Sequence, residues 1–356
     1  MGLGCPVAVK SSITLMIALV ALTGCAASDP RGPEAAAVLD DAVSDGGPGC
    51  SAAVAEEGEV VWTYARGMAD LERSIPIDTT TRFNIGSVSK QFTATAALIL
   101  AEEGALALTD SVADHIDGLP PWAAEVTVAD LMTHTSGIFD LSFGSPDEII
   151  DREDRLRILD EHPDAHREPE SFRYANDNYV LLGLIVEEAG GEGLDEWMRE
   201  HVFAAYDVDM VVQPGAVADD VALGYEEGAP PFTQSPKTYM APGPTGIIAS
   251  PSELARWGDH YREPEVLPAG ELERALSAAP PVDGPDSEWR YGPGVFVSED
   301  GMILHGGQDA GIATSFAVSP DRRTTVALSC NWRIWNPDET VTALHEIWFG
   351  EDPDTP

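Results

Sequence analysis

Residues 87–104 of this 356-residue chain read SVSKQFTATAALILAEEG, and this stretch decides the fold. From Ser87 to Glu103 apolar side chains occur on nearly every side of the expected helix, and Gly104 ends it. A helix that is hydrophobic all round is a buried one. Lys90 therefore stands in an environment where a lysine is unfavourable. We expect a central buried helix that carries one charged side chain in its first turn.

The sequence Ser87-Val88-Ser89-Lys90 places a hydroxyl and an amine on one face of that helix. Positions i and i+3 lie one above the other, so Ser87 Oγ and the Lys90 ammonium can meet. Free N–H groups at the helix N-terminus favour a developing anion beside Ser87. Burial lowers the pKa of a lysine toward that of a usable base. The alternative is that Ser87 caps the helix while Lys90 extends outward to water.

The charge composition narrows the function classes. The chain has 20 Lys+Arg against 61 Asp+Glu, a formal net charge of −41 and 44% hydrophobic residues. Such a chain has no basic footprint for nucleic acid or for anionic lipid, which excludes both as electrostatic partners. Its apolar content is enough to bury a core, and one or two domains are expected. Lysine occurs only at Lys10, Lys90 and Lys237, so any site that uses a lysine must use one of these.

The N-terminal residues have the pattern of an export signal. Lys10 precedes an apolar stretch at residues 13–22 that is too short to span a bilayer. The next residues, Thr23-Gly24-Cys25, resemble the lipobox of bacterial lipoproteins, which implies cleavage before Cys25 and lipidation of its thiol. The alternative is an ordinary signal peptide cut near Ala26. Both interpretations predict an exported, extracytoplasmic protein. The lipoprotein interpretation also predicts a lipid anchor at Cys25 in the cell membrane or outer membrane.

The remaining sequence predicts strands at both ends with helices between them. The expected elements are a helix at residues 34–45, a hairpin around Glu57-Gly58, a helix beyond Ser250, an antiparallel meander at residues 291–297, 302–305, 314–318 and 325–330, and a last helix at about 337–348. We therefore predict an α/β (α+β) fold, in which one antiparallel sheet is built from both termini and flanked by helices. The expected organisation is a signal peptide at 1–24, a linker at 25–33, a domain at 34–350 with an inserted all-helical subdomain at roughly 105–250, and an acidic tail at 351–356.

Two further motifs carry polar groups beside apolar segments. Tyr174-Ala175-Asn176 precedes an apolar helix, although an aromatic loop capped by Asn176 or Asp177 would look the same. His305-Gly306-Gly307 follows the short strand at residues 302–304. Paired glycines there would let a substrate approach the backbone closely, and the alternative is a plain turn.

Together the three motifs resemble the serine β-lactamase and penicillin-binding-protein superfamily, in particular its class C β-lactamase-like branch. The family pattern is S-x-x-K, then Y-x-N, then K-T-G or H-x-G on an inner strand. All three occur here in that order, and the flanks at residues 131–137 (LMTHTSG) and 305–311 (HGGQDAG) match as well. The branch includes esterases and D-amino-acid peptidases. The resemblance implies a serine hydrolase with its site between the sheet and the helical subdomain.

The resemblance also implies a role for each matched residue. Ser87 corresponds to the nucleophile that forms an acyl-enzyme, and Lys90 and Tyr174 to the pair that moves its proton. Asn176 corresponds to a ligand of the substrate amide, with His305, Gly306 and Gly307 as further substrate-binding residues. The backbone N–H groups of Ser87 and Gln308 are expected to form the oxyanion hole. No cofactor and no metal are expected.

His305 stands where β-lactamases have a lysine that helps to hold the substrate carboxylate. A histidine near its ordinary pKa is mostly neutral at pH 7 and attracts carboxylates poorly. We therefore expect an ester, amide or D-peptide substrate, small or derived from peptidoglycan, with β-lactams turned over inefficiently. The competing hypothesis is a lipoprotein of the same fold that binds β-lactams or peptidoglycan and acylates slowly or not at all.

Two of the four cysteines remain as a pair, because Cys5 leaves with the signal and Cys25 would carry lipid. In an oxidising compartment Cys50 and Cys330 can form a disulfide. The alternative is that they are two buried, reduced thiols, and their spacing in the sequence does not decide between the two. In the resembled family the first strand of the sheet lies antiparallel beside the last. The resemblance therefore implies a Cys50–Cys330 disulfide.

The remaining histidines give no metal signature. His162 and His166 are four residues apart, but Pro163 interrupts any helix between them. His134 is interpreted as a structural turn residue. The chain has no G-x-S-x-G sequence, which argues against an α/β-hydrolase.

Overall fold

The computed structural model describes residues 1, 29–141, 152–167, 171–212, 221–227, 232–236, 242–332 and 337–350. The predicted signal peptide after Met1, the lipidation site Cys25, Lys237 and the predicted tail at 351–356 lie outside the described residues. No described helix combines the length and the apolar character needed to cross a membrane.

The main sheet is antiparallel and joins the two ends of the chain, which confirms the predicted fold. Its strand order is β10-β11-β12-β13-β14-β1-β2. The N-terminal strands are β1 (Cys50–Glu56) and β2 (Glu59–Arg66), and the C-terminal strands are β10 (Trp289–Tyr291), β11 (Phe296–Ser298), β12 (Ile303–Asp309), β13 (Ile312–Val318) and β14 (Thr324–Cys330). Glu57 and Gly58 both have positive φ, which suits the two-residue turn of the β1–β2 hairpin. The two parts of the sheet meet where β1 pairs with β14.

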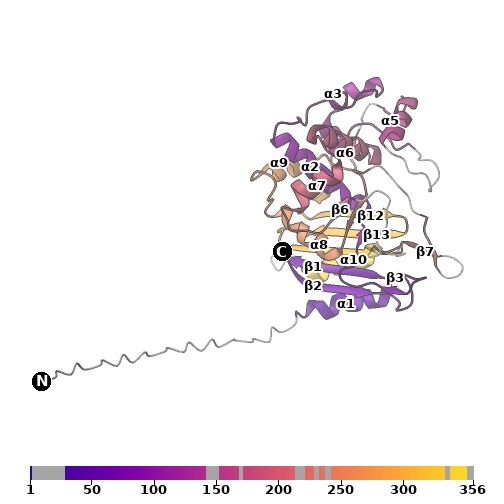
Figure 1. Ribbon diagram of the computed structural model, residues 1–356, viewed down its shortest axis with the longest axis vertical. Coiled ribbons are helices and arrows are strands. Elements are labelled where there is room, and N and C mark those ends of the chain that lie inside the picture. Colours follow the sequence, from indigo (N-terminus) through magenta and orange to yellow (C-terminus); the bar gives the residue numbers. More distant parts are fainter. Residues whose placement is uncertain are drawn as a thin grey trace.

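Helices cover both faces of this sheet (Figure 1). The helices α1 (Arg31–Ala42) and α10 (Pro337–Phe349) pack together on one face, where Leu39, Val54 and Trp348 share a core. The helix α8 (Pro251–Trp257) and the 3₁₀ turn η4 (Gly258–Tyr261) cover the other face. The strand β1 is buried along almost its whole length because side chains on both of its faces meet a helical layer.

The second part of the molecule is mainly helical and surrounds the helix that the sequence analysis placed at the centre. That helix, α2 (Lys90–Glu102), is buried from Lys90 to Leu100 and packs mainly on α6 (Asn176–Gly190). The other helices are α3 (Val112–His115), α4 (Val128–Met132), α5 (Arg152–Glu161), α7 (Leu194–Met198) and α9 (Glu271–Ser277), with the turns η1 (Gly86–Ser89), η2 (Pro121–Ala124) and η3 (Arg199–Phe203).

The region predicted to be all-helical, roughly 105–250, also contains short strands. The strand β9 (Ile247–Ala249) pairs with β5 (Phe83–Asn84) and β6 (Val211–Val212). In the same region β7 (Tyr225–Glu227) pairs with β8 (Phe232–Gln234). Before this region, β3 (Met68–Asp70) pairs with β4 (Ile75–Pro76). Ile247 and Ile248 are buried, and the Ile247 carbonyl accepts a hydrogen bond from Ile85 N at 3.0 Å. These apolar residues form a strand because they complete a small sheet beneath the start of α2.

Two further boundaries differ from the prediction. The run at residues 291–297 is divided into β10 and β11, because Gly292 and Gly294 adopt positive φ (136° and 76°) and reverse the chain. The strand predicted at residues 302–305 continues to Asp309, so His305-Gly306-Gly307 lies inside β12 rather than in a turn after it.

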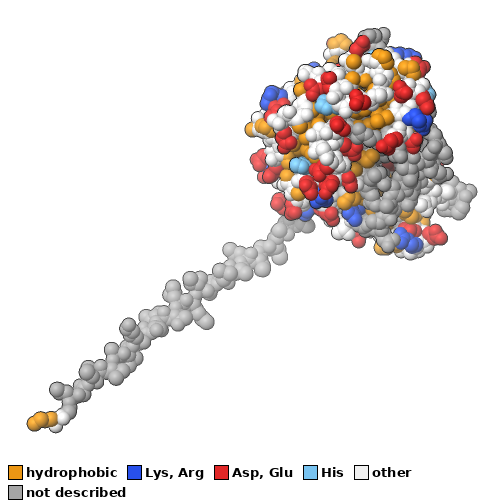
Figure 2. Space-filling model, turned by 45° about the horizontal axis from the view of Figure 1, so that its top comes forward, with side chains coloured by type: hydrophobic (Ala, Val, Ile, Leu, Met, Phe, Trp, Pro, Cys, Tyr) orange, Lys and Arg blue, Asp and Glu red, His pale blue; other side chains and the backbone are white. Residues whose placement is uncertain are grey.

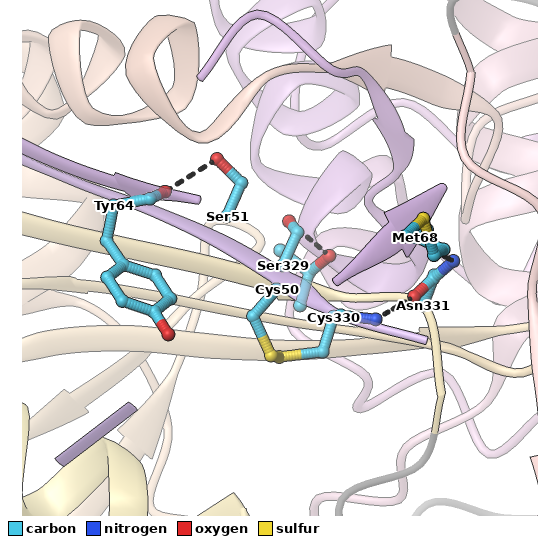
Figure 3. The surroundings of a disulfide bond; sticks show 9 residues. Cys50, Ser51, Tyr64, Met68, Ser329, Cys330 and Asn331 are labelled. Atoms are coloured by element: carbon cyan, nitrogen blue, oxygen red, sulfur yellow. Dashed lines mark hydrogen bonds between the residues drawn. A yellow bond between two sulfur atoms is a disulfide. The ribbon is translucent and has the colours of Figure 1, made fainter. Parts of the chain in front are cut away.

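A disulfide joins Cys50 to Cys330, the pair that the resemblance implied (Figure 3). The two residues face each other directly in the β1–β14 register, with 4.0 Å between their Cα atoms. Both are buried. Beside them Asn331 accepts from Gly49 N at 2.7 Å and donates to the Met68 carbonyl at 2.9 Å. The crosslink therefore sits at the junction between the N-terminal and C-terminal halves of the sheet.

The surface reflects the acidic composition. Figure 2 shows Asp and Glu side chains spread over the visible face, with few Lys and Arg among them. Many of the arginines that the structure describes are engaged with carboxylates, such as Arg66 with Asp40 and Asp45.

Candidate active site

The site is built where the turn η1 leads into α2. Ser87 lies in η1 and is half-buried, whereas Lys90 opens α2 and is fully buried. Lys90 Nζ lies 2.9 Å from Ser87 Oγ. The structure therefore brings these two side chains together, and Lys90 does not extend outward to water.

Lys90 is held by two other partners and by burial. Its ammonium donates to Asn176 Oδ1 at 2.8 Å and to the Pro244 carbonyl at 3.0 Å. Burial lowers the pKa of Lys90 to about 7, against a smaller opposing effect from the charge of Asp140. A lysine with this pKa exists partly as the free amine near neutral pH, and a free amine can accept a proton from Ser87 Oγ.

Tyr174 lies beside this pair, from the loop before α6. Lys90 Nζ lies 4.9 Å from the centroid of the Tyr174 ring. Burial raises the pKa of the Tyr174 hydroxyl well above its ordinary value, although its hydrogen bond with Ser87 opposes the shift. Tyr174 is therefore a neutral hydroxyl near neutral pH, and Lys90 is the group there whose pKa suits a base.

Asn176, which is predicted to bind the substrate amide, contacts two charged side chains of the site. Its Oδ1 accepts from Lys90, and its Nδ2 donates to Asp140 Oδ2 at 3.2 Å. Asp140 Oδ1 in turn accepts from Asp177 N at 3.1 Å, at the first turn of α6. Burial raises the pKa of Asp140, against the opposing effects of its hydrogen bonds and of Lys90. Asn176 thus orients the lysine, and only part of its amide remains for a substrate.

The strand β12 passes directly over the nucleophile turn. A Cβ atom at Gly307 would lie 2.0 Å from the Ile85 carbonyl oxygen and 3.1 Å from Ser87 N, so only glycine allows this approach. A Cβ atom at Gly86 would likewise lie 2.6 Å from Gln308 N. These contacts bring the backbone nitrogens of Ser87 and Gln308 to the same region.

Gly306 has a different environment from its neighbour. It is exposed, and a Cβ atom built on it would meet nothing within 4 Å. The structure itself therefore gives no steric reason for glycine at this position. The open space at Gly306 leaves room for a ligand to lie along β12.

His305 is a residue of β12, and its side chain is buried rather than directed to solvent. Its Nε2 lies 3.3 Å from the Tyr291 hydroxyl, and its Nδ1 lies 2.6 Å from the Gly306 carbonyl. Burial lowers the pKa of His305 to about 3, with the charge of Lys90 acting in the same direction. The imidazole is therefore neutral and supplies no positive charge for a substrate carboxylate.

His134 occupies a tight turn, as expected, but it also packs on the site. It has positive φ (57°) and is fully buried. Its Nδ1 accepts from Asn178 Nδ2 at 2.8 Å and from Ala175 N at 3.3 Å. Its ring lies 4.4 Å from that of Tyr174, centroid to centroid. Burial lowers its pKa well below the ordinary value, so His134 is a neutral support for the loop that carries Tyr174.

The other histidines considered in the sequence have local contacts. His162 Nδ1 lies 2.8 Å from the Ile158 carbonyl, and His166 stacks on Trp122. Among the described residues one group has metal-ligand spacing, Glu192, Glu200 and His201, and two of these three are exposed.

Sequence reasoning missed four polar residues around the site. Asp140 contacts Asn176, while Asn84, Thr245 and Asp309 form a cluster on the other side of the nucleophile turn. Asp309 lies in the flank of the third motif and Asn84 just before the first, but nothing in the sequence indicates that they contact each other or Thr245. They meet only because the fold brings β5, β9 and β12 together.

The sheet between helical layers, with a serine and a buried lysine at the start of the central helix, defines a serine hydrolase of the β-lactamase and transpeptidase type. The beta-lactamase family model matches residues 35–347, and the chain belongs to this family.

Individual relatives are distant. The chain is 24% identical over 297 residues to "Protein flp" of Staphylococcus aureus (strain MW2), a match that covers 80% of this chain and 59% of that protein. It therefore spans about three fifths of that relative. It is 24% identical over 335 residues to "Penicillin-binding protein 4*" of Bacillus subtilis (strain 168), covering 85% of this chain and 72% of the relative.

A solved structure of similar fold is a D-amino acid amidase from Ochrobactrum anthropi SV3, complexed with D-phenylalanine. The TM-score is 0.79 at 22% identity, and the match covers 90% of this chain and 99% of that one. At this identity the likeness establishes the fold alone.

Proposed function

We propose that this protein hydrolyses an ester, amide or D-peptide bond through a covalent acyl-enzyme on Ser87. The observation that carries the proposal is the 2.9 Å contact between half-buried Ser87 and a buried lysine whose pKa is lowered to about 7. An amine in this state can remove the Ser87 proton as the hydroxyl attacks a carbonyl carbon.

The reaction then follows from the positions of the remaining groups. The neutral Tyr174 hydroxyl, hydrogen-bonded to Ser87, is suited to pass the proton to the leaving group. The backbone N–H groups of Ser87 and Gln308 would receive the negative charge of the tetrahedral intermediate, and such a donor is typically worth ~3 kcal/mol. Water then attacks the acyl-enzyme, with the same groups moving the proton in reverse. These steps use only side chains and backbone of this chain.

The electrostatics of the site favour a substrate that does not need a cation for its own carboxylate. His305 is neutral, and Asp140 places a carboxylate 3.2 Å from Asn176. An anionic β-lactam would find neither a lysine on β12 nor a positive surface. The proposed substrate is therefore a neutral or amine-bearing ester, amide or D-peptide, with peptidoglycan-derived peptides as one source.

The proposed location is outside the cytoplasm, with a lipid anchor at Cys25, and the proposed position within the family is its class C-like branch. The lipobox-like Thr23-Gly24-Cys25 supports the anchor, and H-x-G in place of K-T-G supports the branch. Radioactive palmitate incorporation into wild type, but not into Cys25→Ser, would test the anchor.

The decisive experiment is covalent labelling with a fluorophosphonate and with a fluorescent penicillin. We expect labelling of wild type and of the control Ser277→Ala, an exposed serine, and none of Ser87→Ala. Turnover of p-nitrophenyl esters, D-amino-acid amides, D-Ala-D-Ala peptides and cephalosporins then ranks the substrates. Labelling of Ser87 without turnover would favour the binding-lipoprotein alternative, and no Ser87-dependent labelling would refute the hydrolase.

A further inference from the structure

Asp309 ends β12, one residue after Gln308, and makes contacts that no step of the proposed reaction uses. Its Oδ2 accepts from Asn84 Nδ2 at 2.8 Å and from Thr245 Oγ1 at 3.0 Å. The three side chains are half-buried and come from β12, from the end of β5 and from the segment before β9.

The first contact connects Asp309 to the nucleophile turn. Asn84 uses its Nδ2 for Asp309 and its Oδ1 to accept from Gly86 N at 3.0 Å. Gly86 directly precedes Ser87 and has positive φ (54°), and it touches the backbone of Gln308. Asp309 and Asn84 therefore hold the turn of Ser87 against the strand of Gln308 through one chain of two hydrogen bonds.

The second contact connects Asp309 to the group that orients the lysine. Thr245 follows Pro244, whose carbonyl accepts from Lys90 Nζ at 3.0 Å. A hydrogen bond from Thr245 to Asp309 fixes this segment relative to β12. One carboxylate thus ties together the three segments that carry Ser87 N, Gln308 N and the Lys90 acceptor.

We propose that Asp309 is a positioning residue that sets the separation of the two oxyanion-hole nitrogens and the direction of the Lys90 amine. The proposal rests on the proposed function, because it concerns the same site. Asp309 acts by geometry rather than by charge, since burial lowers the pKa of Lys90 and the charge that opposes this shift is that of Asp140. Asparagine at this position keeps one oxygen that accepts the same two hydrogen bonds.

The test compares Asp309→Ala with Asp309→Asn, and with Asp300→Ala as a matched control. Asp300 is an exposed aspartate of the turn before β12, where it accepts from Ser298 Oγ, and it lies at the opposite end of that strand from Asp309. We expect Asp309→Ala to lower kcat on a p-nitrophenyl ester by ~10²-fold with KM nearly unchanged, the loss typical of a misplaced oxyanion donor. Affinity for a boronate transition-state analogue should fall in parallel. Asp309→Asn and Asp300→Ala should retain most of the wild-type kcat.

Three outcomes would overturn the proposal: wild-type kcat in Asp309→Ala, equal losses in Asp309→Ala and Asp309→Asn, or a KM effect without a kcat effect. Circular dichroism and a melting curve establish that Asp309→Ala is folded. If Asp309→Ala is not folded, Thr245→Val serves as the test, because it removes one of the two hydrogen bonds with little change of shape. Thr245→Val should lower kcat by several-fold. An unchanged kcat in Thr245→Val would also count against the proposal. An inactive wild type that fails to label at Ser87 would refute the proposed function, which distinguishes the two failures.

Discussion

The lowered pKa of Lys90 makes the pH dependence of catalysis a direct test of the mechanism. Burial lowers the pKa of Lys90 from 10.5 to about 7, which is equivalent to ~5 kcal/mol against the ammonium form in the folded protein. Because the free amine is the base, kcat/KM should be full above pH 8, fall to half near pH 7, and drop roughly tenfold for each further unit.

Among the described groups at the site, Asp140 also has a raised pKa, and its substitution below separates its titration from that of Lys90. The pKa of His305 is lowered to about 3 and that of His134 falls well below its ordinary value, whereas the pKa of Tyr174 is raised. An acidic limb near pH 7 would therefore report Lys90. The assay is p-nitrophenyl ester hydrolysis from pH 5 to 9, followed at the isosbestic wavelength of the product, with stability checked at each pH.

Two variants make the assignment specific. The charge of Asp140 raises the pKa of Lys90, so Asp140→Asn should move the acidic limb to lower pH and increase relative activity at pH 6. Glu161→Gln, on the exposed end of α5, should leave the limb in place. A flat profile down to pH 5, or a limb that Asp140→Asn does not move, would refute Lys90 as the base.

Four further predictions address the base, the glycines, the disulfide and the surface. Lys90→Arg keeps the positive charge but cannot act as a base, so kcat should fall by roughly 10²–10⁴-fold, and retained activity would exclude the base role. Gly306→Ala should leave the melting temperature unchanged, whereas Gly307→Ala should cost ~1–3 kcal/mol because its methyl group meets the Ile85 carbonyl; equal melting temperatures would contradict this. Replacing both Cys50 and Cys330 by alanine should lower the free energy of unfolding by up to ~5 kcal/mol in urea titrations, since the bond closes a separation of 280 residues, and no change would refute this contribution. Raising NaCl from low to molar concentration should raise the melting temperature by screening repulsion at a net charge of −41, and a lower value would argue against a repulsive surface.

Local sequence patterns predicted what depends on local geometry. The Ser87–Lys90 contact follows from i,i+3 spacing at a helix start, and the β1–β2 hairpin from a turn pair between two strand patterns. The resemblance to a family supplied the long-range pairing of β1 with β14. The contact and the hairpin depend on residues that are close together in sequence, whereas the β1–β14 pairing joins distant segments and followed only from the resemblance.

The parts that could not be predicted depend on contacts between distant segments. Asn84 and Asp309 are separated by 225 positions, and Asp309 and Thr245 by 64. Their side chains are ordinary polar residues in sequence and acquire a role only when β12 crosses the nucleophile turn. The local pattern ended the strand at His305, whereas the resemblance placed the third motif on an inner strand; pairing with β13 carries β12 to Asp309 despite the low strand preference of glycine.

The position of α1 bears on the proposed lipid anchor, because α1 is the first described element after Cys25. The helix begins at Arg31 and packs with α10 on the sheet face opposite the helical part that contains α2 (Figure 1). Between the proposed lipid site at Cys25 and Arg31 the chain can span at most ~20 Å. A protein anchored in this way would keep the start of α1 within that distance of the bilayer, and Ser87 would lie across the sheet from α1. It would meet substrates that diffuse in the aqueous layer or extend from the cell wall, rather than molecules embedded in lipid.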